Sequence, residues 1–105
     1  MTGIIKVKMT RHASEDRLDR LVACIQHLGV GEIVLENEHY GAIQKLTSTG
    51  LCLVCGKDDL LITGYMCTIQ QCSAMYIANG YERVPEKIYK TVTRNQKQYK
   101  FLLDM

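Results

Sequence analysis

Residues 51–65 read LCLVCGKDDLLITGY, which is two apolar runs of β-type residues joined by a polar turn. The four residues between the runs, GKDD, have the glycine and aspartate chemistry of a tight connection between paired strands. We therefore predict a β-hairpin with strands at residues 51–55 and 60–65. Because both runs are apolar on both faces, we expect the two strands to lie in the middle of a sheet.

Further elements are predicted on both sides of this hairpin. Upstream, β-type runs predict strands, and helical spacing of apolar residues predicts one helix that Ser14 caps. Downstream, helical spacing returns twice, and Pro85 suits the first turn of the second helix. The predicted strands are residues 3–9, 32–36 and 42–47, the predicted turns are 37–41 and 48–50, and the predicted helices are 14–28, 67–78 and 86–103.

The order of these elements predicts the fold class. The strands between residues 32 and 65 follow one another too closely for crossover helices, so they are expected to pair antiparallel. We predict an α+β fold with a central antiparallel β-meander, an N-terminal strand–helix unit and two C-terminal helices. The 105 residues suffice for one domain and contain no linker, so residues 1–105 are expected to form a single α+β domain.

The composition predicts a cytoplasmic protein with no membrane partner. No stretch of 18 residues is apolar throughout, and Lys6 and Lys8 interrupt the apolar N-terminal run, so neither a membrane span nor a signal peptide is predicted. The five cysteines are an odd number and are expected to stay reduced.

The net charge of +2 is unevenly distributed along the chain. Residues 1–20 carry a net charge of +2, residues 21–80 of −3, and residues 81–105 of +3. If the basic ends meet in the fold, they form one positive face for nucleic acid or for an acidic protein surface. On charge alone, we favour the simpler interpretation that these side chains solvate helix faces.

Cysteine spacing raises the question of a zinc-binding module. Cys52 and Cys55 have the spacing of a zinc knuckle, and Cys67 and Cys72 lie downstream. However, residues three apart on a strand point to opposite faces, and the downstream pair is loosely spaced. We therefore favour free thiols that pack in the core.

Residues 10–20 read TRHASEDRLDR and combine a histidine with an arginine-rich helix start. His12 can transfer protons near neutral pH, and arginines bind phosphate oxygens bidentately. Arg17 and Arg20 are three residues apart and so share a helix face. On spacing alone, we favour salt bridges between these arginines and the acidic residues of the same segment.

A strand, then Thr-x-His-Ala, then an arginine-rich helix resembles the His-Ala-x-x-Arg opening of small phage and mobile-element proteins. Those proteins are related to RelE-like toxins, within the barnase–colicin–RelE nuclease group. Residues 50–55 and 61–65 are similar to the closing strands of the family, where a Thr-x-Tyr strand end borders the active cleft. The resemblance covers roughly residues 5–66, and Arg17 stands five residues after His12, where the family has four.

The resemblance implies RNA as the target and a cleavage reaction that uses no metal or cofactor. His12, Arg17 and Tyr65 would be catalytic: His12 as base or acid, Arg17 on the phosphate, and Tyr65 as proton donor or base-stacking group. The residues expected to bind RNA are Arg20, Thr63, Lys90, Arg94 and Lys97. The last helix would follow the RNA backbone only in part, because its five basic residues are not expected to share one face. The leading hypothesis is an RNA-binding, RelE-like protein, a weak or inactive ribonuclease.

The second hypothesis belongs to another functional class, because a fold does not fix a function. It is a phage-encoded, non-enzymatic inhibitor of a host defence protein, such as an anti-CRISPR protein. This hypothesis predicts an exposed patch that includes Tyr76, Tyr81 and Tyr89. The partner is thus RNA or a host protein, and the oligomeric state is left open.

Overall fold

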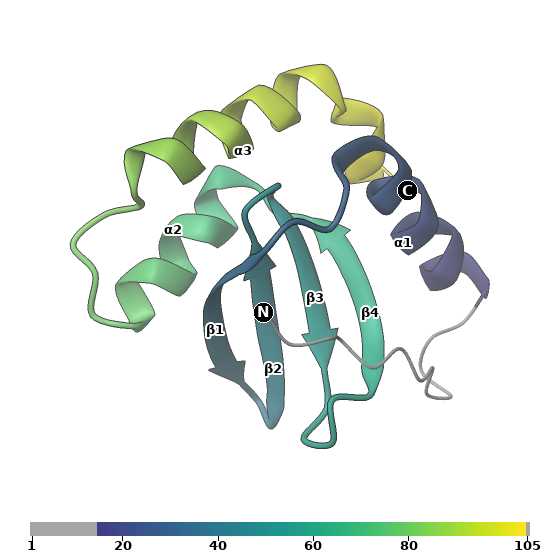
Figure 1. Ribbon diagram of the computed structural model, residues 1–105, viewed down its shortest axis with the longest axis horizontal. Coiled ribbons are helices and arrows are strands. Elements are labelled where there is room, and N and C mark those ends of the chain that lie inside the picture. Colours follow the sequence, from purple (N-terminus) through teal and green to yellow (C-terminus); the bar gives the residue numbers. More distant parts are fainter. Residues whose placement is uncertain (1–14, 105) are drawn as a thin grey trace.

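The computed structural model describes residues 15–104, with side chains from residue 18 onward. Four strands and three α-helices are followed by a short 3-10 helix (Figure 1). The elements are α1 Glu15–Leu28, β1 Ile33–His39, β2 Ala42–Thr47, β3 Leu51–Cys55, β4 Leu61–Met66, α2 Ile69–Ala78, α3 Glu86–Gln98 and the 3-10 helix η1 Lys100–Asp104.

The strands form one antiparallel meander in the order β1-β2-β3-β4, which confirms the predicted α+β class. The predicted hairpin is present, with Leu53 opposite Gly64. Within the sheet built by residues 15–104, β3 is an inner strand, as expected, and β4 forms an edge. The predicted strand at residues 3–9 and the Ser14 cap lie outside the described residues.

Strand β1 is longer than its sequence predicts. Residues 37–39 were expected to turn, but they continue the strand, and Asn37 pairs with Gln44. The Asn37 Nδ2 donates to the Gln44 Oε1 at 2.8 Å. This cross-strand side-chain bond stabilises the pairing of β1 with β2 at the extended end of β1. The chain reverses at Tyr40 and Gly41, both of which have positive φ.

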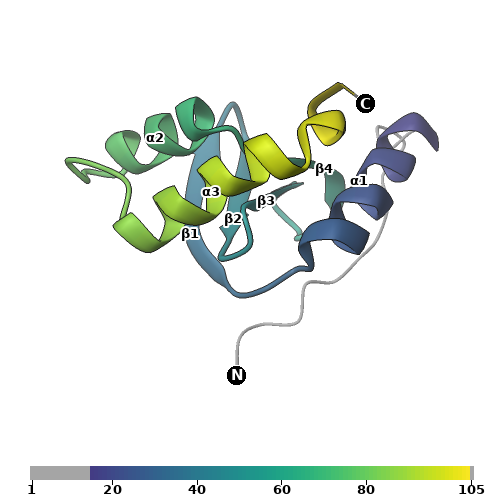
Figure 2. The same cartoon turned by 90° about the horizontal axis from the view of Figure 1, so that it is seen from above.

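Helices cover both faces of the sheet, as Figures 1 and 2 show. Successive residues of β3 enter different cores, because side chains of a strand alternate between faces. One core joins the sheet to α2 and α3; it includes Leu46, Cys52, Met75, Tyr76 and Val92. The other joins the sheet to α1 and η1; it includes Leu21, Cys24, Leu53, Leu61 and Leu102. In Figure 2, α3 crosses above the end of the sheet.

Helix α1 confirms the predicted helix but buries a narrower face than expected. Leu21 and Cys24 are buried, whereas Leu18, Val22 and Ile25 are each 38–44% exposed. The helix lies against Gly64, where a Cβ atom would overlap the Leu21 Cδ1. Because α1 packs closely over Gly64, the side of the helix that carries Leu21 enters the core.

The two C-terminal helices differ from their prediction at one end each. Helix α2 begins at Ile69 rather than residue 67, because Thr68 caps it. Helix α3 ends at Gln98, and the chain continues as η1. Asn95 does not interrupt the buried face of α3; its Nδ2 donates to the Thr49 carbonyl at 2.7 Å. Among residues 15–104, no helix has the length and apolar character to cross a membrane.

Candidate RNA-binding site

Arg20 reaches from α1 to β4. Its Nη2 donates to the Thr63 Oγ1 at 3.0 Å, and its Nε donates to the Gly64 carbonyl at 3.2 Å. The guanidinium carbon lies 6.0 Å from the centroid of the Tyr65 ring, at the limit of cation–π attraction. The structure thus brings together Tyr65, which the resemblance assigned to catalysis, and Arg20 and Thr63, which it assigned to RNA binding.

A pocket of about 330 Å³ adjoins Arg20 and Tyr65. Thr68 and Gln71 line it from the start of α2, and each caps the other's backbone N–H, at 3.2 and 2.9 Å. A guanidinium carries five N–H donors. The bonds of Arg20 to β4 use two of its N–H groups and leave others for an anion in this pocket.

The Tyr65 hydroxyl belongs to a polar chain on the sheet. The Gln44 Nε2 donates to it at 3.0 Å, and the Asn37 Nδ2 donates to Gln44 in turn. Burial above all, and then the neighbouring Cys52 thiol, raise the pKa of Tyr65 far above its usual range. A phenol that resists ionisation transfers protons poorly near neutral pH. This favours the stacking role of Tyr65 over the proton-donor role.

A basic stripe runs along the solvent side of α3. Lys87, Lys90, Arg94 and Lys97 follow the spacing i, i+3, i+7, i+10, which places them on one helix face, and all four are exposed. The five basic residues from Lys87 to Lys100 were not expected to share one face; these four do share one, and Lys100 lies in η1. We call these four residues the α3 basic stripe; at 1.5 Å per residue it is about 15 Å long.

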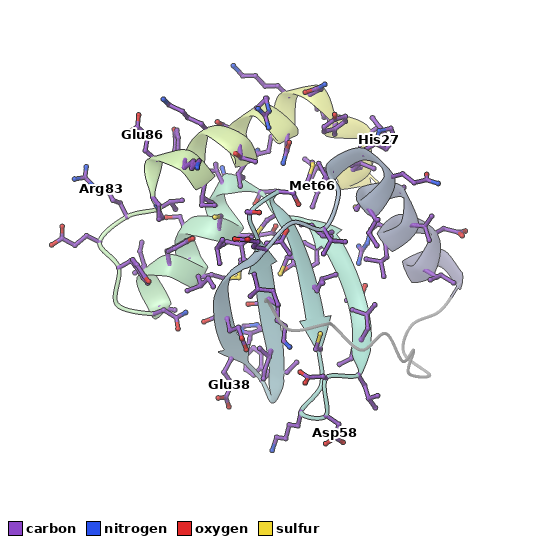
Figure 3. All side chains as sticks on the ribbon, viewed as in Figure 1. His27, Glu38, Asp58, Met66, Arg83 and Glu86 are labelled. Carbon is purple, nitrogen blue, oxygen red and sulfur yellow. The ribbon has the colours of Figure 1, made fainter. Side chains whose placement is uncertain are left out.

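The opposite face of α3 holds the stripe in place. Ile88, Val92 and Asn95 are buried on it. On the stripe itself, the Lys90 Nζ pairs with Glu86 at 3.1 Å, a surface ion pair that contributes little stability. Figure 3 labels Glu86 at the start of this helix, and labels Glu38 and Asp58 at the other end of the sheet. Apart from Glu86, the exposed side of α3 thus carries the α3 basic stripe, and the far turns carry Glu38 and Asp58 together with Lys57.

The α3 basic stripe and the Arg20 pocket are separate groups. Lys90, Arg94 and Lys97 do not line the pocket, whereas Leu102 and Leu103 of η1 do. Because η1 directly follows α3, it connects the two groups. His12 and the side chain of Arg17, both assigned to catalysis, lie outside the described part of the chain.

The four cysteines of the possible zinc site do not form one ligand set. Cys52, Cys67 and Cys72 belong to the core under α2 and α3, whereas Cys55 belongs to the core on the opposite face of the sheet. Among the described residues, no group of three or more His, Cys, Asp or Glu side chains is arranged to hold a metal ion. Burial raises the pKa of Cys52 and Cys72 to about 11, as expected for thiols that pack as small apolar groups.

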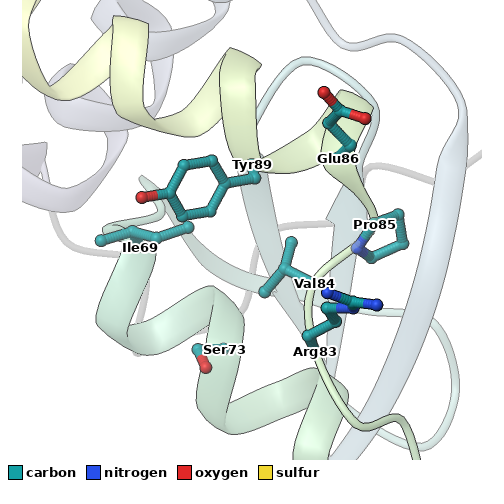
Figure 4. Close-up of a pocket in the computed structure, with 7 residues that line it drawn as sticks. All are labelled: Ile69, Ser73, Arg83, Val84, Pro85, Glu86 and Tyr89. Atoms are coloured by element: carbon teal, nitrogen blue, oxygen red, sulfur yellow. The ribbon is translucent and has the colours of Figure 1, made fainter.

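The predicted tyrosine patch is smaller than expected. Tyr76 is buried, and its ring contacts Tyr81 at 5.1 Å between centroids. Tyr81 and Tyr89 are about half exposed. Beside Tyr89, a pocket of about 630 Å³ lies between α2 and the start of α3; Figure 4 shows its lining residues, Ile69, Ser73, Arg83, Val84, Pro85, Glu86 and Tyr89.

One aromatic cluster was missed from the sequence. The ring of His27 lies 5.3 Å from that of Tyr99 and 5.1 Å from that of Phe101, between centroids. No local motif signals it, because His27 comes from α1 and the other two rings from the C-terminal end of the chain. The sequence feature that could have indicated it is Phe101, which follows a series of spaced basic residues between positions 87 and 100.

No family model, curated protein or solved structure matches this chain.

Proposed function

We propose that this protein binds RNA. The observation that carries the proposal is the α3 basic stripe, four exposed cations on one helix face. Such a row neutralises successive phosphates and releases their counterions, which is the main source of affinity for nucleic acid. Because Val92 and Asn95 fix the opposite face of α3, the stripe presents its charges without prior rearrangement.

The Arg20 pocket supplies the second contact in this proposal. Arg20 is already oriented by its bonds to Thr63 and Gly64, so its remaining N–H groups can hold a phosphate at low entropic cost. The Tyr65 ring beside it offers a face for stacking. Phosphate on Arg20 and a base near Tyr65 together match the roles that the resemblance to RelE-like proteins implied.

The RelE-like relationship and a weak or lost ribonuclease activity belong to the same proposal. Cleavage needs a group that takes the proton of the ribose 2′-hydroxyl and one that protonates the leaving oxygen. Since the pKa of Tyr65 is raised, His12 is the candidate for proton transfer. If the protein cleaves RNA, His12→Ala is expected to abolish product on a labelled RNA; unchanged cleavage contradicts the role of His12.

The binding test compares two exposed lysines. Lys97→Gln removes one charge from the α3 basic stripe, and Lys57→Gln removes one from the β3–β4 turn. We expect Lys97→Gln to weaken binding of a labelled single-stranded RNA. The plot of log binding constant against log salt concentration should also become less steep, by about 0.7. Lys57→Gln should match the wild type in both. Identical salt slopes for the wild type and both variants contradict the proposal.

A second candidate function is inhibition of a host defence protein by direct binding. It is favoured by the 630 Å³ pocket beside the half-exposed Tyr89, because aromatic residues around an apolar pocket are typical of interface hot spots. The test is co-purification of a host protein after RNase treatment. Tyr89→Ala should lose that protein, and Tyr40→Ala, on the β1–β2 turn, should keep it; loss of the captured protein on RNase treatment contradicts this function.

A further inference from the structure

We infer that His27, Tyr99 and Phe101 form a stacking site for an unpaired base, which makes single-stranded RNA the ligand of this protein. The inference rests on the proposed RNA binding and adds a site that lies apart from the Arg20 pocket. It also gives the path of the bound strand over the protein surface, which runs along the α3 basic stripe to η1.

The three rings form one open cluster at the end of α3. His27 and Phe101 meet edge to face at 81°, and Tyr99 and Phe101 at 82°. Phe101 is 51% exposed, and it is the only phenylalanine of the chain. Packing of α1 against η1 explains the contacts between the rings but leaves part of the Phe101 ring in water. An exposed ring beside a row of cations is the combination that single-stranded nucleic acid binders use.

Two of the three rings, His27 and Tyr99, line a pocket of about 330 Å³, and Phe101 contacts both of these rings from outside the lining. The pocket lies between the end of α1, the β2–β3 turn and α3, and its polar lining includes Ser48, Arg94 and Gln98. The Ser48 Oγ accepts from the Glu32 N–H at 3.0 Å, and a serine hydroxyl can also donate. The pocket therefore offers both donors and acceptors to the edge of a base, next to rings that can stack on its face.

Arg94 links the pocket to the α3 basic stripe. It lines the pocket, and it occupies the third position of the stripe. A strand whose phosphates follow Lys87, Lys90 and Arg94 therefore arrives at the pocket with a base in reach of the rings. A duplex does not satisfy this arrangement, because its bases are stacked inside the helix and cannot meet a side-chain ring.

The walls of the pocket are held by a set of hydrogen bonds. The Asn95 Nδ2 donates to the Thr49 carbonyl at 2.7 Å, and the Thr49 Oγ1 donates to the Gly29 carbonyl at 2.9 Å. These bonds join α3, the β2–β3 turn and the loop after α1. A preformed pocket needs little ordering when a ligand enters, which favours binding.

The experiment measures binding of a fluorescein-labelled oligouridylate of about 12 nucleotides, within the usual site size for single strands. Phe101→Leu keeps an apolar side chain but removes the ring, and Phe101→Trp keeps a ring. We expect Phe101→Leu to weaken binding by about 5-fold to 100-fold, the loss of one stacked base, and Phe101→Trp to bind as the wild type does. Tyr40→Leu removes an even more exposed ring from the β1–β2 turn, 96% against 51% for Phe101, and should change nothing.

A direct readout comes from the same variant. The chain contains no tryptophan, so Phe101→Trp introduces the only indole. Its fluorescence should be quenched when oligouridylate binds, and should stay unchanged with an RNA hairpin that has no unpaired tail. Saturating oligouridylate without quenching overturns the inference. Circular dichroism checks the fold of each variant, and His27→Gln replaces Phe101→Leu if the latter does not fold.

The outcomes separate this inference from the proposed function. If the wild type binds no RNA, both fail. If Lys97→Gln weakens binding while Phe101→Leu and His27→Gln do not, RNA binding stands and the stacking site is wrong. If Phe101→Leu weakens binding of oligouridylate and of the hairpin equally, the ring acts through packing and the stacking site is again wrong.

Discussion

Helix α1 packs closely over Gly64 of β4. A Cβ atom there would overlap the Leu21 Cδ1 and lie 3.3 Å from the Leu53 Cδ2. Because Gly64 has no side chain, α1 lies close enough to β4 for Arg20 to reach Thr63. One missing methyl group connects the packing of the helix to the geometry of the candidate site.

Gly64→Ala should therefore destabilise the protein by overpacking, by about 1–3 kcal/mol in the free energy of unfolding. Urea denaturation measures the loss. Gly56→Ala is the control, because a Cβ atom there meets only ordinary contacts, the nearest at 3.9 Å. Equal denaturation midpoints for the two variants contradict this account of how α1 packs.

Asn95 is a polar residue whose role depends on a distant turn. It is 3% exposed, and its amide bonds the Thr49 carbonyl of the β2–β3 turn. On the sequence alone, it interrupted an apolar stripe, because the partner lies 46 residues away. Its burial shows that an amide can belong to a core face when a backbone carbonyl reaches it.

Asn95→Asp should cost about 1–3 kcal/mol, because it removes the donor of this part-buried bond and places a carboxylate against the Thr49 carbonyl. Thermal unfolding measures the loss. Gln98→Glu, an amide-to-carboxylate change at an exposed position of the same helix, should shift the midpoint far less. A similar loss in both variants would point to the added charge and not to the hydrogen bond.

At the scale of elements, the sequence predicts the bounds of those helices and strands that local residue patterns determine. The hairpin, β2, α1 and the start of α3 lie within one residue of their predicted bounds, because alternation, turn residues and Pro85 act locally. The length of β1, and the position of β4 at an edge of the sheet within residues 15–104, depend on pairing between strands. The sequence pattern of a buried strand did not distinguish an inner strand from an edge strand that a helix covers.

The same division applies to the candidate site. The resemblance assigned Tyr65 to catalysis and Arg20 and Thr63 to RNA binding, and the structure places Arg20 against both β4 residues. The α3 basic stripe follows from residue spacing once Lys100 is set apart, and the structure places Lys100 in η1. The His27 cluster was out of reach, because its rings meet only when α1 and η1 pack together.

For the whole molecule, the buried thiols predict how stability depends on pH. Burial raises the pKa of Cys52 and Cys72 from an ordinary 9.0 to about 11. Between these values, the unfolded chain has lost thiol protons that the folded chain keeps. Folding stability should therefore fall as the pH rises from about 9 to 11, by up to about 1.4 kcal/mol per pH unit for each thiol.

Urea unfolding at several pH values, with reductant present, tests this expectation. The Cys52→Ala and Cys72→Ala double variant should be less stable at pH 7 but should lose less stability between pH 9 and pH 11. A double variant whose stability falls as steeply as that of the wild type assigns the pH dependence to other groups.

The separation of charge between α3 and the far turns also has a kinetic consequence. The α3 basic stripe turns α3 towards an approaching polyanion, whereas Glu38 and Asp58 at the far turns repel it. Long-range attraction speeds encounter and is screened by salt, whereas a stacked base separates by breaking short-range contacts. In stopped-flow measurements, added salt should therefore slow association more than Phe101→Leu does, and Phe101→Leu should mainly shorten the lifetime of the complex. Charge along α3 would thus govern how often RNA arrives, and the aromatic rings would govern how long it stays.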